Sequence, residues 1–121
     1  MNTNSIFEEL VTKLNTTNSL EANAAVVVLL RSTDRGIQVL LVKRAEKSTD
    51  PWSGQIALPG GKRNLKDSDL KHTVIRETLE ETAINLLKNC RFLGTMEQFT
   101  SIQKPEMKIV PFIVILEKKQ K

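Results

Sequence analysis

The 121-residue sequence contains little cysteine and histidine and no long apolar run. Cys90 is the single cysteine, so no disulfide can form within the chain, and a reducing, cytoplasmic location is expected. With His72 as the single histidine, the chain has too few nitrogen and sulfur ligands for a standard structural zinc site. No apolar run approaches the roughly 20 residues of a membrane span, so no membrane partner is expected.

The composition is that of one ordinary globular domain, which we expect to span residues 1–121. Hydrophobic residues make up 40% of the chain and charged residues 26%, and the net charge is only +4. The basic end at 117–121 is most simply a solvated terminus. Basic surface is the single feature in favour of a small nucleic-acid-binding protein, so nucleic acid is not the expected partner.

Hydrophobic periodicity predicts an α+β order of elements. The segment 4–14 reads as a helix with a capping box from Ser5 to Glu8. Aliphatic and β-branched runs predict a hairpin around the turn at 33–36. Pro111 predicts an edge strand or a bulge. The predicted strands are 24–31, 37–44, 55–58, 91–99 and 107–116.

A second helix carries the most informative residues, Arg76-Glu77 and Glu80-Glu81. Glu77 and Glu81 are four residues apart, so they lie on one helical face, and Glu80 flanks that face. Crowded carboxylates repel one another unless positive charge lies among them, and their hard oxygens favour Mg²⁺ or Mn²⁺. Arg76, four residues before Glu80, is expected to pair with Glu80 and orient it.

The same helix needs a buried face and an amino-terminal cap. Val74, Ile75 and Leu79, with Thr78 between them, are expected to form a stripe turned away from the glutamates. Asp67, Ser68 and Asp69 offer oxygens that can cap the helix. His72 is expected to be solvated.

A Glu-rich helix is most often a plain solvated surface, but the upstream context makes that interpretation weaker. A Pro59-Gly60-Gly61 turn precedes the helix, and glycine lets backbone approach metal or phosphate closely. With this turn, the segment resembles the Nudix hydrolase box, G-x5-E-x7-R-E-U-x-E-E-x-G-U, where U is aliphatic. Gly61, 76–77, 80–81 and Ile84 match that pattern.

The match has departures, and these resemble one branch of the family. The loop before the helix is one residue longer than the box specifies, and Asp67 stands where the first Glu is expected. Thr78 replaces an aliphatic residue and Ala83 replaces the second glycine. The longer loop and the Ala look like the coenzyme A pyrophosphatase branch. The second arginine of that branch is missing from the region 47–50.

The resemblance implies a Nudix fold, an α/β/α sandwich-like arrangement of a mixed sheet with a loop-helix-loop box. It also implies a further covering helix after the last strand, where this chain is short. The segment 4–14, a partner subunit or a longer domain would have to supply that cover. Because the run 109–116 would otherwise be exposed, we predict a homodimer.

The function implied is metal-dependent hydrolysis of a diphosphate linkage in a nucleoside diphosphate derivative, coenzyme A being one candidate. Glu77, Glu80, Glu81 and the Gly61 carbonyl would hold Mg²⁺ or Mn²⁺. One glutamate would act as general base, and Glu97 or Glu106 would be a candidate from outside the box. The alternative is a catalytically silent Nudix-fold binding or regulatory module.

Substrate contacts are expected around the turn and the loop before it. Cations on either side of the loop would offset polyphosphate charge, and Trp52 can stack on a base or simply cover the core. Coenzyme A derivatives, nucleoside diphosphate sugars, dinucleotides and oxidised nucleotides all remain open. The residues expected to bind substrate are Arg44, Trp52, Gln55, Gly60 and Lys62.

Overall fold

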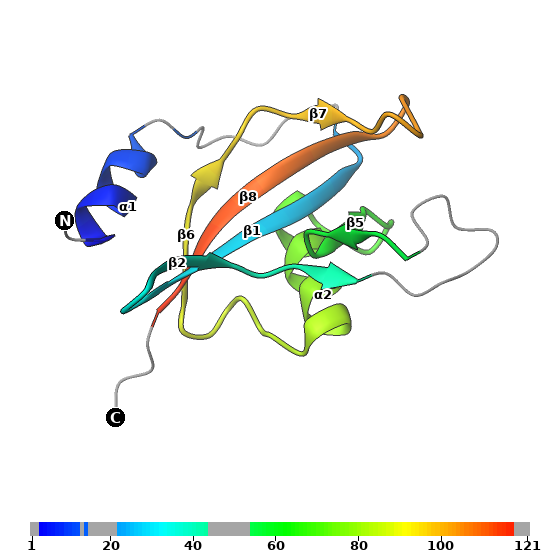
Figure 1. The fold of residues 1–121 in the computed structure, drawn as a ribbon. Helices are drawn as coiled ribbons and strands as arrows, with labels where there is room; N and C mark the ends of the chain where they lie inside the picture. Colours follow the sequence, from blue (N-terminus) through cyan, green and yellow to red (C-terminus); the bar gives the residue numbers. More distant parts are fainter. Residues whose placement is uncertain (1–2, 13, 15–21, 44–53, 118–121) are drawn as a thin grey trace.

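The computed structural model describes residues 3–12, 14, 22–43 and 54–117, with the side chains of 3–5 not described (Figure 1). The predicted substrate contacts Arg44 and Trp52 lie outside the described residues. The elements are α1 (Thr3–Val11), β1 (Ala24–Thr33), β2 (Gly36–Val39), β3 (Val42–Lys43), β4 (Ile56–Ala57), β5 (Gly60–Lys62), α2 (Leu70–Thr82), β6 (Cys90–Thr95), β7 (Phe99–Thr100) and β8 (Lys108–Leu116).

The main sheet is mixed and has the strand order β2-β1-β8-β6. β1 and β8 are parallel along their length, from Ala24↔Ile109 to Leu30↔Ile115, whereas β2 and β6 are antiparallel to their neighbours. β5 pairs with the start of β1, and β7 pairs with the start of β8. β3 and β4 form a separate two-stranded sheet. The predicted α+β class is confirmed, although the predicted strands 37–44 and 91–99 are each divided in two.

One helix lies on each face of the main sheet, as a sandwich requires. The face toward α2 carries alternate residues of β1 and β8, which pack with Leu70 and Val74. The opposite face carries Ile113 and Ile115, which pack with Phe7 of α1 and with Leu93. The strand period of two explains why neighbouring residues of one apolar strand enter different cores.

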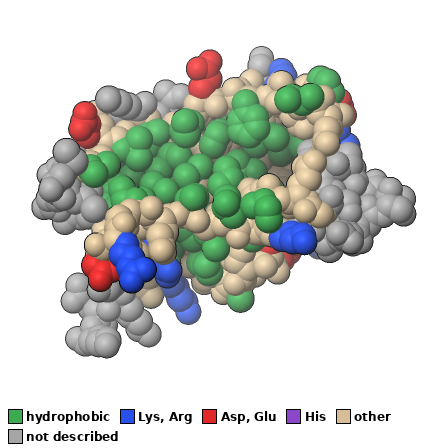
Figure 2. Space-filling view, in the orientation of Figure 1, with side chains coloured by type: hydrophobic (Ala, Val, Ile, Leu, Met, Phe, Trp, Pro, Cys, Tyr) green, Lys and Arg blue, Asp and Glu red, His purple; other side chains and the backbone are tan. Residues whose placement is uncertain are grey.

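Helix α1 therefore supplies part of the cover that the sequence required for the second face. Phe7 is 3% exposed, and Leu10 packs beside it against the same cluster. Figure 2 shows that hydrophobic side chains still gather over the strands on this face. Partly buried Val28 and Leu30 belong to this surface. The homodimer remains a prediction.

Pro111 predicted an edge strand or a bulge, and the edge strand is wrong. β8 lies between β1 and β6, and Val114 is fully buried. Pro111 is tolerated there because its carbonyl accepts from the Met96 N–H (2.9 Å) in the gap between β6 and β7. The N–H and C=O of a strand residue point the same way, so the missing donor faces this gap.

Helix α2 begins and ends as its local sequence dictates. Asp69 is its N-cap, and its carboxylate accepts from the His72 N–H (2.8 Å). Ala83 ends the helix in the left-handed region (φ 64°) and donates its N–H to the Leu79 carbonyl. In the part of the chain that the structure describes, neither helix combines the length and apolar character that a membrane span needs.

Candidate active site

The candidate active site lies where α2 packs on the turn between β4 and β5. Gly60 has φ +152°, and a Cβ there would lie 2.2 Å from the Ala25 carbonyl oxygen, so only glycine fits this close approach to β1. A Cβ on Gly61 would lie 2.6 Å from the Glu77 carboxyl carbon. The glycine pair therefore lets the turn pass directly beneath the helix that carries the carboxylates.

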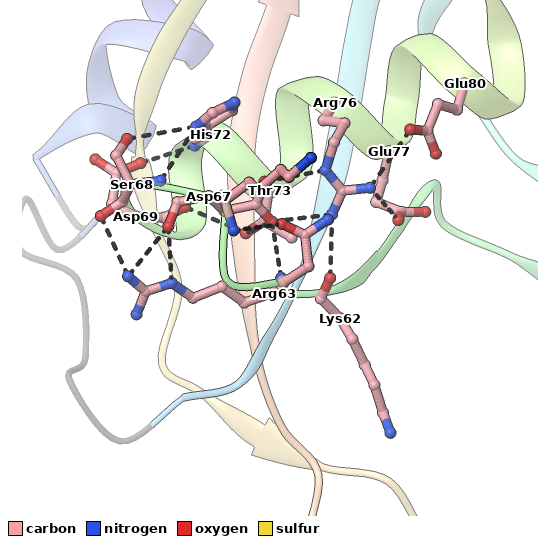
Figure 3. A network of polar contacts seen from close by, with 12 residues as sticks. Lys62, Arg63, Asp67, Ser68, Asp69, His72, Thr73, Arg76, Glu77 and Glu80 are labelled. Carbon is pink, nitrogen blue, oxygen red and sulfur yellow. Dashed lines mark hydrogen bonds and ion pairs between the residues drawn. The ribbon is translucent and has the colours of Figure 1, made fainter.

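Asp67 is the buried centre of the polar network that holds this helix (Figure 3). It is 3% exposed, and its carboxylate accepts from the Asn64 N–H (3.0 Å) and the Thr73 hydroxyl (2.9 Å). Arg76 completes the set in a bidentate pair, from Nε at 3.0 Å and Nη2 at 2.9 Å. A buried carboxylate with this many donors has its charge fully compensated.

The network shifts the pKa values of both partners. Hydrogen bonds from the Arg76 guanidinium hold the pKa of Asp67 well below its ordinary value, although burial alone would raise it. The hydrogen bond to Asp67 likewise raises the pKa of Arg76 above its usual value. Both groups stay charged throughout the pH range in which proteins are stable, so the Asp67–Arg76 ion pair persists over that range.

Arg76 differs from the expectation that it would chiefly orient Glu80. Its Nη1 donates to Glu77 at 2.7 Å, whereas the contact with Glu80 is 3.5 Å and involves a side chain that is 59% exposed. Its Nη2 also donates to the Lys62 carbonyl at 3.3 Å. Arg76 therefore fixes Glu77 and ties the helix to β5, and it holds Glu80 only weakly.

The three glutamates have different contacts and exposures. Glu77 lies half-buried beside Gly61 and Arg76. Glu80 is exposed, and Glu81 accepts from the Gly60 N–H at 2.8 Å. Across the described ranges, no group of three metal-ligating side chains is gathered at one point. Glu77 and Glu80 do share one cationic neighbour, Arg76 Nη1, so positive charge is already accommodated between these two carboxylates.

The apolar stripe of α2 was predicted only in part. Val74 is buried and Ile75 packs on the core, as expected, but Leu79 is 46% exposed. Thr78, which was expected within the stripe, is fully buried, and so is Thr73, so the buried face is rotated toward these threonines. The Thr78 hydroxyl has no hydrogen-bond partner among the described residues.

The remaining predicted residues lie around this centre. Gln55 is exposed just before β4, and Lys62 is exposed at the end of β5 with its side chain directed away from the network (Figure 3). Glu97 and Glu106 are exposed near β7. His72 is exposed as expected, and its Nδ1 accepts from the Ser68 N–H (3.1 Å).

Two site roles were missed by the sequence analysis. Asp67 was expected as a cap or as a substitute for the first Glu of the box, and its pairing with Arg76 across nine residues was not foreseen. Arg63, which was assigned no individual role from the sequence, donates to the Asp67 and Ser68 carbonyls at 3.2–3.3 Å and closes the loop before α2. The one available signal was the pair of acidic residues, Asp67 and Asp69, before the Arg-bearing helix.

Comparison with known proteins gives a consistent family. The NUDIX domain model matches residues 21–120. The human mitochondrial coenzyme A diphosphatase NUDT8 is 42% identical over 64 residues, which are 52% of this chain and 27% of that protein. Mitochondrial Nudix hydrolase 15 of Arabidopsis thaliana is 33% identical over 98 residues, which are 81% of this chain and 33% of that protein.

The fold also matches solved structures. The Caenorhabditis elegans Ap4A hydrolase has a TM-score of 0.61 at 21% identity, covering 83% of this chain and 71% of that one. At this low identity, the structural similarity supports the fold alone. The chain spans a third or less of the length of the curated relatives cited above (27% and 33%).

Proposed function

Because the chain belongs to the Nudix family, we propose that it acts with a divalent cation to hydrolyse a diphosphate linkage in a nucleotide derivative. The observation that carries the proposal is the Asp67–Arg76–Glu77 network, which fixes one carboxylate against the Gly60-Gly61 turn. Burying a charge costs free energy, and an acidic site whose geometry must be fixed requires a network that compensates this charge. A plain solvated helix does not require one.

The cation proposed is Mg²⁺ or Mn²⁺. The donor chemistry fits, because the carboxylate oxygens of Glu77 and Glu80 both accept from Arg76 Nη1. Glu81 accepts from the Gly60 N–H, and the Gly61 carbonyl belongs to the next residue of the chain. A bound cation would supply positive charge for the phosphate oxygens and make water a better nucleophile. Glu80 is the ligand freest to adjust, since its contact with Arg76 is the longest of the network.

The residues of this chain would act in distinct ways. Arg76 would position Glu77, Glu81 would hold the Gly60 turn, and Lys62 would offer a cation near the turn for the substrate phosphates. One of the glutamates would also accept the proton of the attacking water. Coenzyme A derivatives are the substrates proposed first, since the human relative NUDT8 is named a coenzyme A diphosphatase.

The test combines a substrate panel with matched variants. The protein is incubated with Mg²⁺ and coenzyme A, ADP-ribose, NADH, dinucleoside polyphosphates or nucleoside triphosphates, and products are identified by mass spectrometry. We expect cleavage at a diphosphate. Glu80→Gln should abolish turnover with little effect on folding, because Glu80 is exposed, and Glu8→Gln on α1 is the control of equal charge change.

Binding of the metal is read separately from activity. Mn²⁺ broadening of amide signals should centre on α2 and the 60–62 turn and be weakened by Glu80→Gln. Cleavage that continues in Glu80→Gln at the unaltered rate would remove the assignment. Mn²⁺ binding without cleavage of any compound would instead support the alternative, a Nudix-fold binding module.

A further inference from the structure

A cavity of about 190 Å³ lies at the opposite end of α2 from its capping network. Aliphatic side chains from four segments form most of its wall, with Leu29 from β1, Leu40 after β2, Ile84 after α2, and Leu116 at the end of β8. Leu29 is 3% exposed and the other three pack against the main core cluster, so the wall is continuous with the core. The cavity thus belongs to the rigid part of the domain.

The cavity exists because α2 is shorter than the strands beneath it. The helix ends at Thr82, with Ala83 in the left-handed conformation, whereas β1 continues to Thr33. The chain leaving α2 then runs past the ends of β1 and β8 toward β6 (Figure 1). A single turn of irregular chain covers less of the sheet than a helix does, so apolar wall remains open to solvent.

Two polar residues complete the wall, and they are fixed by one another. Arg31 and Gln38 are cross-strand partners in the β1–β2 ladder, and Arg31 Nε donates to Gln38 Oε1 at 2.7 Å. This bond engages the Nε of Arg31, and both residues line the cavity. Within the described ranges, no carboxylate forms an ion pair with Arg31.

We propose that this cavity is a second ligand site, which binds a small organic anion with a compact apolar body. The aliphatic wall would remove the body from water, and Arg31, held by Gln38, would pair with a carboxylate or phosphate at the mouth. The volume sets the size of the body, since an engineered apolar cavity of about 150 Å³ holds benzene. A chain of about six carbons is of that size. None of the three glutamates lines the cavity, so ligand binding there is read independently of the proposed hydrolase activity.

Hexanoate is the probe for this site, followed by chemical-shift changes in ¹H–¹⁵N spectra of the full chain. Saturable shifts are expected at 29–31, 38–40, 84 and 116. Hexan-1-ol, which lacks the charge, and acetate, which lacks the apolar body, should each bind roughly tenfold more weakly or worse. Arg31→Gln should weaken hexanoate by a similar factor. Arg35→Gln, an exposed arginine of the same hairpin, is the matched control and should change nothing.

Several outcomes would overturn the proposal. Shifts that rise linearly without saturation, or that centre on Phe7 and Ile113 of the other sheet face, would show nonspecific apolar association. Equal losses in Arg31→Gln and Arg35→Gln would show a general charge effect. Ile84→Trp, which fills the cavity, should abolish binding. Because Ile84 packs on the core, the exposed Arg31 variant provides the decisive comparison if Ile84→Trp does not fold.

Discussion

Replacing Asp67 by Asn is the sharpest test of the network beneath the candidate active site. Asn keeps the size of the side chain but removes its charge and brings an NH₂ group among donors from Asn64, Thr73 and Arg76. Breaking a buried charge pair by removing one partner costs about 3–5 kcal/mol. Arg76 is 24% exposed and keeps Glu77 as a partner, so we expect the lower end, about 3 kcal/mol.

Urea unfolding at pH 7 measures this loss. For an m value near 2 kcal/mol/M, the midpoint should fall by about 1.5 M with m unchanged. Asp69→Asn is the control, because it makes the same chemical change two residues away. Asp69 is exposed and Asn is an equally good N-cap, so its loss should stay below about 0.5 kcal/mol. A loss under about 1 kcal/mol for Asp67→Asn would show that the pair behaves like a surface ion pair and would refute the reasoning.

The effect of Asp67→Asn on the free energy of unfolding should depend on pH. Folding lowers the pKa of Asp67 below its unfolded value of about 4, so its charged form stabilises the fold. That stabilisation is fully present above pH 4 and is lost as the pH falls below it toward the folded pKa. The difference in stability between wild type and Asp67→Asn should therefore be constant from pH 5 to 8 and shrink below about pH 4. A difference that grows on acidification would contradict the sign of the shift.

Three further changes have directions set by the structure. Thr78→Val should stabilise the protein by about 1 kcal/mol in thermal unfolding, because it removes a buried hydroxyl without a described partner; destabilisation would reveal a partner. Gly61→Ala should leave the fold intact but weaken Mn²⁺ binding, because its Cβ would displace the Glu77 carboxylate; unchanged binding would remove Glu77 from the metal site. Gly60→Ala should lower the melting temperature by several degrees, because its Cβ would meet backbone of β1; a wild-type melting curve would show that the turn can relax.

Local signals in the sequence predicted the elements well where the physics is local. The capping residue Asp69, the start of α2 and the strand character of 24–31 follow from side-chain chemistry and residue periodicity within a few positions. The family followed from the spacing of glycines and glutamates, and the α+β class followed from hydrophobic periodicity; both were confirmed. Divisions such as that of 91–99 into β6 and β7 were not predicted, because they depend on which neighbour each half finds along β8.

Side-chain pairing was harder to predict than element type. The spacing predicted that Arg76 pairs with Glu80, since residues four apart on a helix are neighbours. In the fold, Asp67 is removed from water next to the same guanidinium, and a buried carboxylate binds it more strongly than an exposed one does. The orientation of α2 likewise buries Thr78 and exposes Leu79, because the sheet and the 60–62 turn decide which face is covered.

The sequence by itself determined the helix that carries the carboxylates, the glycine turn and the family, because these rest on contacts between residues close in the chain. Only the tertiary structure decided that Asp67 is the buried anchor, that β8 is an interior strand despite Pro111, and that a cavity opens beside Arg31. Each of these depends on segments far apart in the sequence. Burial, which sets the strength of a charge pair or the size of a cavity, exists only once those segments have packed.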